Sequence, residues 1–212
     1  YLLFITLWFF SCLASAQTNS DRVLKIVVPF GPGGGSDFLA RLIAPKLGEA
    51  LKETVVIDNR PGAGGTVGAD FVAKSAPDGQ TVLLSDSGAY SISPALYPKL
   101  SYAPKDLAPV INLAIFGNVL VANPKLPANN MVELLALEKS QPGKLSYGSS
   151  GNGASPHLTA ELFKTATGIR MTHVPYKGSG PAINDLVSGH IDVMFTGYAT
   201  VSGLIKSGRL KP

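Results

Sequence analysis

The 212 residues carry a formal net charge of only +4, and 45% of them are hydrophobic whereas 15% are charged. This length is enough for one large domain or for two small domains with cores of their own. The low proportion of charged residues argues against a disordered or coiled-coil chain. No stretch of the sequence brings four basic residues together, so the charge pattern also argues against nucleic-acid binding.

The N-terminal segment predicts an exported protein. Residues 1–13 are uncharged and apolar, and the small residues Ala14-Ser15-Ala16 follow them. This is the pattern of a secretory signal peptide, here residues 1–16 with cleavage after Ala16, and the apolar run is shorter than the roughly 20 residues that a membrane-spanning helix needs. A lipid anchor at Cys12 is the weaker alternative. Once the segment is removed, the chain contains no cysteine and therefore no disulfide or thiolate chemistry.

After this segment, strand-like apolar runs alternate with helical patterns. In chain order, we predict strands at Leu24–Pro29, Thr54–Asn59, Thr81–Ser85, Val119–Asn123, Lys144–Tyr147, Met171–Val174 and Ile191–Phe195. We predict helices at Phe38–Leu51, Ala69–Ser75, Met131–Lys139, His157–Thr167 and Gly180–Ser188. The alternation predicts an α/β fold with mostly parallel sheets. The Pro- and Tyr-rich stretch 91–110 predicts a packed connection, and the composition changes near 117–125, where a second α/β unit begins.

Three glycine-rich stretches lie between a predicted strand and a predicted helix: VPFGPGGGSD (28–37), NRPGAGGTVGAD (59–70) and YGSSGNGASPH (147–157). In parallel α/β sheets, ligands bind beyond the carboxyl ends of the strands, where these loops are expected. A helix N-terminus offers unpaired N–H groups and a partial positive charge, both of which favour anions. One such loop is commonly only a turn, but three in one chain favour a small anion that is held mainly by the backbone.

The second loop also resembles a dinucleotide-binding fingerprint. Gly62, Gly64 and Gly68 follow a predicted strand, and Asp86 ends the next strand. Pro61 before the first glycine, the short helix and the predicted export argue against this alternative. No phosphate-binding G-x-x-x-x-G-K-[ST] motif is present, and we expect no cofactor.

Catalytic patterns are weak. The histidines at 157, 173 and 190 have no metal-ligand spacing and no cysteine beside them, so we expect no metal site. The run Gly148–Asn152 approaches a nucleophile elbow, but Asn152 stands where G-x-S-x-G requires its last glycine, and the sequence offers no evident base for Ser149 or Ser150. Asp37 is expected either to cap the helix that follows it or to face the ligand crevice.

Four motifs in this order resemble the Bug-type solute-binding proteins of tripartite tricarboxylate transporters: VPFGPGGGSDFLAR, IDNRPGAGGTVGADFVA, YGSSGNGASPHLTAELFK and VPYKGSGPAINDLVSGHIDVMF. The resemblance extends from Lys25 to Lys211. It implies a two-lobed, hinged "Venus flytrap" fold of the type II-like periplasmic binding proteins, with lobe one at 23–118 and lobe two at 119–212. It also implies that a C-terminal segment that returns to lobe one is missing.

The resemblance further implies function. Such a protein is periplasmic and monomeric, has no catalytic activity, and captures a small mono-, di- or tricarboxylate for a membrane permease. Two alternatives stay open, a ligand-sensing protein for a membrane signalling partner and, more weakly, an exported hydrolase. The sequence does not name the acid.

The family's ligand loops map onto defined residues here. The resemblance places the ligand carboxylate against Phe30, Gly33, Gly34, Gly35, Ser36 and Asp37 of lobe one, and Ser149, Ser150, Gly151, Asn152, Gly153, Ala154, Ser155 and His157 of lobe two. It places the distal end of the ligand near Asp86, Ser87, Gly88, Thr196, Gly197 and Tyr198. Family members often have Thr or Ser at the position of Ala154, so Ser155 is a possible substitute donor.

Overall fold

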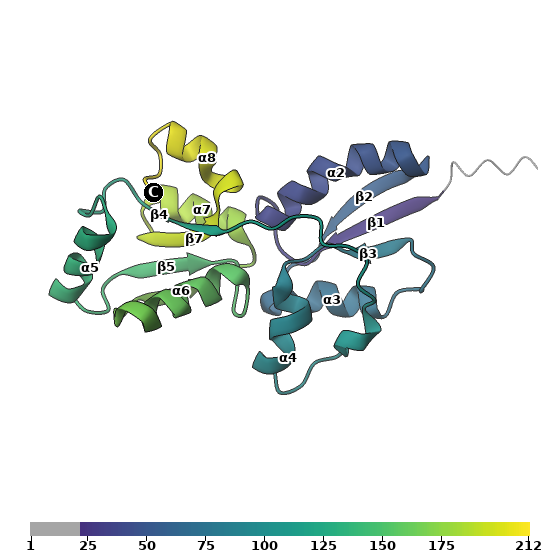
Figure 1. Cartoon of the computed structure of the whole chain (residues 1–212), viewed down its shortest axis with the longest axis horizontal. Helices are drawn as coiled ribbons and strands as arrows, with labels where there is room; N and C mark the ends of the chain where they lie inside the picture. The colour runs from purple at the N-terminus through teal and green to yellow at the C-terminus, as the bar shows by residue number, and fades with distance from the viewer. Residues whose placement is uncertain (1–21) are drawn as a thin grey trace, which may run out of the picture.

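The structure, a computed structural model, describes residues 22–212, and the predicted signal peptide lies outside them. The chain forms two α/β lobes that lie side by side, each built on its own sheet (Figure 1). The first sheet has the order β2-β1-β3 and is entirely parallel, whereas the second has the order β4-β7-β5-β6 with β4 antiparallel to β7. The prediction of an α/β fold with mostly parallel sheets is therefore confirmed.

Lobe one is a three-layer unit. Its elements are β1 (Val23–Val28), α2 (Gly35–Leu51), β2 (Thr54–Asn59), η2 (Ala63–Gly65), α3 (Thr66–Ala73), β3 (Thr81–Leu83), η3 (Gly88–Ile92), α4 (Ser93–Leu96) and η4 (Pro104–Asp106). Helices α2 and α3 cover opposite faces of the sheet (Figure 1). Ile26 and Val28 of β1 pack under Ala40 of α2, whereas Lys25, on the other face of the same strand, lies over Phe71 of α3.

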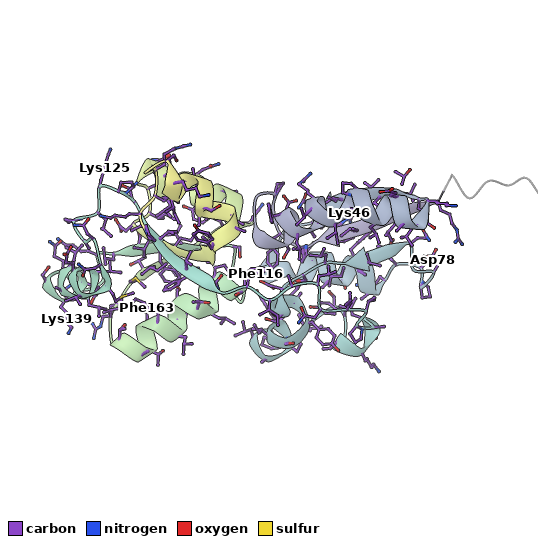
Figure 2. All side chains as sticks on the ribbon, turned by 45° about the horizontal axis from the view of Figure 1, so that its top comes forward. Lys46, Asp78, Phe116, Lys125, Lys139 and Phe163 are labelled. Carbon is purple, nitrogen blue, oxygen red and sulfur yellow. The ribbon has the colours of Figure 1, made fainter. Side chains whose placement is uncertain are left out.

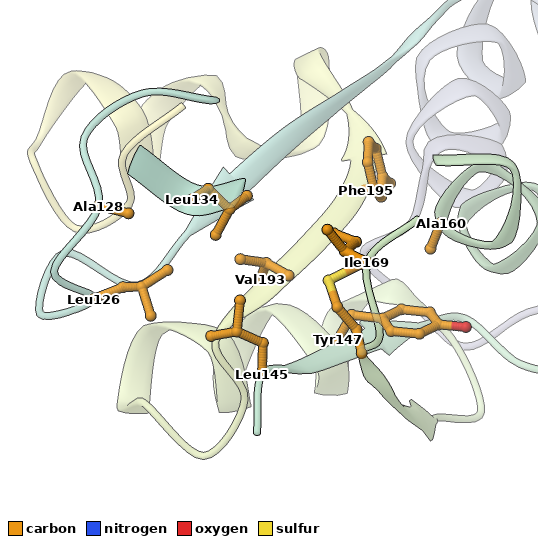
Figure 3. Packing of buried hydrophobic residues seen from close by; sticks show 10 residues of the cluster. Leu126, Ala128, Leu134, Leu145, Tyr147, Ala160, Ile169, Val193 and Phe195 are labelled. Atoms are coloured by element: carbon orange, nitrogen blue, oxygen red, sulfur yellow. The ribbon is translucent and has the colours of Figure 1, made fainter. Parts of the chain in front are cut away.

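Lobe two follows the same plan with four strands. Its elements are β4 (Asn118–Ala122), α5 (Met131–Ser140), β5 (Ser146–Ser149), α6 (Ser155–Thr167), β6 (Thr172–Pro175), α7 (Ser179–Ser188), β7 (Val193–Gly197) and α8 (Tyr198–Lys206). Alternate residues of β7 point to opposite faces of the sheet. Val193 and Phe195 belong to the cluster under α5 and α6, in which Figure 3 shows Val193 at the centre, and Met194 belongs to the cluster under α7 and α8.

The predicted elements are present, with small shifts at their ends. Helix α2 begins at Gly35 rather than at Phe38, so the end of the first glycine-rich loop forms the first helical turn. The stretch 91–110 contains a short helix, α4. Helix α8 was not predicted; its sequence, YATVSGLIK, contains β-branched residues and a glycine, which have low intrinsic helix propensity. Burial of Val201 under the second sheet supplies the stabilisation that local propensity lacks.

The two lobes are joined by the segment 107–117, and we place the boundary between the lobes within it. This segment has no strand partner among the described residues, and Val110 and Ile115 are 88% and 91% exposed. Phe116 lies at the junction of the lobes (Figure 2). The described part of the chain contains no helix that is long and apolar enough to cross a membrane.

Candidate functional site

A pocket of about 420 Å³ lies between the two lobes. It is lined from both lobes and from the segment that joins them. Its lining residues are Phe30, Gly34, Gly35, Ser36, Asp37, Leu39, Leu83, Leu84, Ser85, Asp86, Ser87, Ile111, Asn112, Leu113, Ala114, Ile115, Phe116, Asn118, Ser150, Ser155, Pro156, Ser179, Thr196 and Gly197. None of these lining residues is a lysine, an arginine or a histidine.

Four helices begin at this pocket. Gly35 opens α2, Ser155 opens α6, Ser179 opens α7, and Gly197 is the residue before α8; all four line the pocket. The N–H groups of a first helical turn have no partner within the helix, and each N-terminus carries a partial positive charge. The pocket can therefore attract an anion through backbone groups although it contains no basic side chain.

Asp37 stabilises the conformation of the first glycine-rich loop, residues 28–37. Its Oδ2 accepts hydrogen bonds from Gly33 N–H and Arg41 Nε, both at 3.0 Å, and its Oδ1 accepts from Arg41 Nη2 and Asn59 Nδ2, also at 3.0 Å. Burial by itself would raise the pKa of Asp37, but the hydrogen bonds from Arg41, Gly33 and Asn59 outweigh it and lower the pKa. Gly33 has φ +88°, a left-handed conformation that glycine adopts without strain. Asp37 thus fixes the loop as an ionised carboxylate, with its oxygens occupied by protein donors.

The lobes meet through closely apposed backbone. Gly31 N–H of lobe one donates a hydrogen bond of 2.8 Å to the carbonyl of Lys177 in lobe two. A Cβ on Gly180 would come within 2.3 Å of the Pro32 carbonyl oxygen, and one on Gly64 within 2.0 Å of the Asn152 carbonyl oxygen. These approaches are possible only because neither glycine has a side chain, so these glycines allow the lobes to close.

The comparisons with known proteins agree with this geometry. Residues 39–212 match the model of the tripartite tricarboxylate transporter family receptor, TctC. The chain belongs to this family. It is 41% identical to protein BugT of Bordetella pertussis over 93% of the chain and 61% of that protein, and it therefore spans about three-fifths of the length of this relative.

Solved members of the family have the same fold. One solved structure, of a periplasmic transporter, is 41% identical in sequence to this chain and superposes with a TM-score of 0.87. The match includes 92% of this chain and 65% of the transporter chain. The R. palustris protein Rpa4515, solved with adipate, is 36% identical with a TM-score of 0.87 and the same coverage. MatC from Rhodopseudomonas palustris, with bound malate, is 33% identical with a TM-score of 0.84, over 90% of this chain and 65% of MatC. This TctC-family chain therefore has the two-lobed fold of periplasmic binding proteins.

In this family member, about half of the expected ligand residues line the pocket: Phe30, Gly34, Gly35, Ser36, Asp37, Asp86, Ser87, Ser150, Ser155, Thr196 and Gly197. Gly33 supports the first loop instead, and Tyr198 is 51% exposed. The other residues outside the lining are Gly88, Ser149, Gly151, Asn152, Gly153, Ala154 and His157. The Ser155 hydroxyl, expected as a substitute donor, accepts a hydrogen bond from Asn118 Nδ2 at 3.0 Å.

The glycine-rich turn of the third loop faces lobe one rather than the pocket. Gly151 lies against Gly64, and a Cβ on Gly88 would come within 3.3 Å of the Gly153 carbonyl oxygen. Tyr97 donates a hydrogen bond of 3.4 Å to the Asn152 carbonyl. This part of the loop, which follows the end of β5, therefore forms a second contact between the lobes.

Ser179 and Asn118 also line the pocket, and neither was predicted from the sequence. Lys177-Gly178-Ser179-Gly180 follows β6 and opens α7, so it is a fourth glycine-rich strand-to-helix junction of the kind used to predict the other three. Asn118 had no sequence signal, because its position in the pocket depends on how the second lobe closes on the first.

Ser149 has a base partner that the sequence did not indicate. Its Oγ shares a hydrogen bond of 2.6 Å with His173 Nε2, and accepts one from Gly151 N–H at 3.1 Å. Ser149 is, however, completely buried and does not line the pocket. A serine in this position holds the turn of the third loop and cannot meet a substrate bound between the lobes.

His173 stands in the middle of an aromatic stack. Its ring lies 4.7 Å from the ring of Tyr147 and 4.3 Å from that of His157, measured between centroids. Burial first, and the neighbouring His157 second, lower the pKa of His173 to about 4. Burial also lowers the pKa of His157, whose Nδ1 accepts a hydrogen bond from Gly153 N–H. Both imidazoles are therefore neutral near pH 7 and support the third loop by packing.

Proposed function

We propose that the protein is an extracytoplasmic solute-binding protein that captures a small organic carboxylate for a tripartite transporter. One observation carries the proposal: four helix N-termini meet at a pocket between the lobes that contains no basic side chain. Each N-terminus stabilises a nearby negative charge by about 0.3–1 kcal/mol, or by up to about 2 kcal/mol when partly buried. The adipate and malate found in two solved relatives support a carboxylate as the ligand.

Closure of the lobes would complete the site. The N-terminus of α2 belongs to lobe one, whereas those of α6, α7 and α8 belong to lobe two, so a ligand contacts N-termini of both lobes only when the lobes are together. A ligand shifts a hinged protein toward the closed state by the difference in its affinity for the two states. We therefore propose a flytrap cycle in which the bound acid favours the Gly31–Lys177 contact between the lobes.

The proposal is tested by thermal shift of the whole protein against mono-, di- and tricarboxylates and aromatic acids, with neutral sugars and amines as controls. At least one acid should raise the melting temperature, because a ligand that binds only the folded state stabilises it. A rise with sugars or amines but with none of the acids would contradict carboxylate binding.

Delivery to a permease is a separate part of the proposal. A strain that lacks the protein should lose uptake of the acid that binds, and regain it when the protein is restored. If uptake is unchanged but a transcriptional response to that acid disappears, the protein acts as the ligand sensor of a signalling system instead.

A further inference from the structure

Asp86 is the acidic residue of the pocket lining that has no cationic side chain beside it in the described part of the chain. It follows β3 at the edge of the pocket, and its Oδ1 accepts a hydrogen bond of 2.9 Å from Gly88 N–H. Its Oδ2 accepts one of 3.4 Å from Ser155 N–H, across the cleft at the start of α6. Each carboxylate oxygen can accept about two hydrogen bonds, so Asp86 keeps unused acceptor positions on both oxygens.

Asp37 differs from Asp86, because it has a cationic partner. Asp37 is the other acidic residue of the lining, and Arg41 binds both of its oxygens. Among the described residues, Asp86 has no lysine, arginine or histidine within salt-bridge distance. Burial raises the pKa of the Asp86 carboxyl, and the hydrogen bonds from Gly88 N–H and Ser155 N–H only partly offset this effect.

A second polar atom beside Asp86 also lacks a partner. Ser85 lines the same pocket, and its Oγ is buried without a hydrogen-bond partner in the described part of the chain. Buried hydroxyls in folded proteins nearly always have a partner, and the missing one is commonly a water, an ion or a ligand. Ser85 and Asp86 therefore present a hydroxyl group and a carboxylate on the same side of the pocket.

We propose that Asp86, together with Ser85, makes the pocket select carboxylates that also carry a hydrogen-bond donor, an ammonium group above all and a hydroxyl group second. This inference rests on the proposed function, because it requires that a carboxylate occupies the helix N-termini. An ammonium placed against Asp86 supplies the absent cation and can donate to the unused acceptor positions. A second carboxylate in the same place either is repelled by the ionised form of Asp86 or requires Asp86 to bind a proton, so it gains less than an ammonium group does.

The test uses three acids that share a four-carbon dicarboxylate skeleton and differ at one position: succinate, malate and aspartate. Dissociation constants are measured at pH 7.5 by calorimetry for the whole protein and for Asp86→Asn. Asn retains an oxygen that can accept from Gly88 N–H but has no charge. The matched control is Asp78→Asn, since Asp78 also accepts from a backbone N–H two residues later, that of Gln80, but lies in an exposed turn.

We expect the unmodified protein to bind aspartate most tightly and succinate least tightly. Asp86→Asn should weaken aspartate binding by about 10- to 100-fold, the range for loss of a charged hydrogen bond, while succinate binding stays the same or improves. Asp78→Asn should leave all three constants unchanged. The five- and six-carbon pairs glutarate and glutamate, and adipate and 2-aminoadipate, extend the test to longer ligands.

The outcomes separate this inference from the proposed function. If plain dicarboxylates bind as tightly as their amino counterparts, the proposed role of Asp86 is wrong, but carboxylate binding stands. The same conclusion follows if Asp86→Asn does not change the ratio of the dissociation constants of aspartate and succinate. If no acid of the three series binds, the inference is wrong, and the wider screen described above decides whether carboxylate binding itself stands.

Discussion

Gly31 and Lys177 link the two lobes through a backbone hydrogen bond of 2.8 Å, although 146 positions separate them in the chain. Around this bond, Gly178 and Gly180 lie directly against Gly31 and Pro32. The contact is made by main chain, so any residue with the necessary backbone could form it, provided that no side chain intervenes. The glycines are therefore a requirement of closure, and this can be tested without touching the pocket.

Gly180→Ala should weaken ligand binding by about tenfold or more, because its Cβ would lie 2.3 Å from the Pro32 carbonyl oxygen when the lobes are closed. In the open protein the same Cβ has room, so the melting temperature without ligand should change little. Calorimetry with the acid that stabilises the protein most gives the affinity, and X-ray scattering shows whether the ligand still makes the molecule more compact. Gly203→Ala, where a Cβ meets nothing within 4 Å, is the control. Normal affinity in Gly180→Ala would refute the closure argument.

Gly34→Val should abolish or strongly reduce binding and leave the helical content intact. Gly34 is the N-cap of α2 with φ −91° and ψ 174°, an extended conformation that valine adopts readily. Its side chain would enter the pocket, since a Cβ there already lies 3.3 Å from Ser179 Oγ. Titration and far-ultraviolet circular dichroism measure the two effects. An affinity equal to that of the parent protein would mean that the first glycine-rich loop is only a turn.

Asp37→Asn should lower the free energy of unfolding by about 1–3 kcal/mol, because it weakens charge-assisted hydrogen bonds to a buried carboxylate. Urea unfolding at pH 7 measures the loss. The control is Asp58→Asn, which removes the ion pair between Asp58 and Arg60; the side chain of Asp58 is 26% exposed, against 5% for Asp37, and exposed pairs contribute about 0–1 kcal/mol. The pKa of Asp37 is lower in the folded protein than its ordinary value of 3.8. The ionised carboxylate therefore stabilises the folded state above pH 3.8, and this stabilisation is lost as the pH falls through the pKa of the folded state. Equal losses in the two variants would contradict a special role for Asp37.

The stability of lobe two should fall as the pH decreases from 6.5 to about 4. His173 has a pKa of about 4 in the folded protein, against an ordinary value of 6.5, so within this window the unfolded chain binds a proton that the folded chain does not. The free energy of unfolding therefore decreases with decreasing pH in this window. His173→Gln, which cannot titrate but can bond to Ser149, should reduce the slope. His190→Gln serves as the control because the side chain of His190 is 72% exposed; an identical slope in both variants would contradict the prediction.

Most of the secondary structure and part of the candidate site could be predicted from the sequence. Strands such as β1 and helices such as α2 follow from local periodicity, and the glycine-rich loops mark the strand ends because few other residues allow those backbone angles. Helix α8 could not be predicted, since burial of Val201 stabilises it rather than its own propensity. The hydrogen bond between Ser149 and His173 could not be predicted either, because it depends on the pairing of β5 with β6.

The sequence by itself determined the family of this protein, its α/β alternation and the presence of helix N-termini suited to an anion, because each of these is recorded in short, local patterns. Only the tertiary structure decided which N-termini share one pocket, that the oxygens of Asp37 are held by Arg41 and Asn59, and that Asp86 faces Ser155 across the cleft. The physical reason is distance along the chain: Asp86 and Ser155 are 69 positions apart. Their approach is set by the packing of two lobes, which no local pattern encodes.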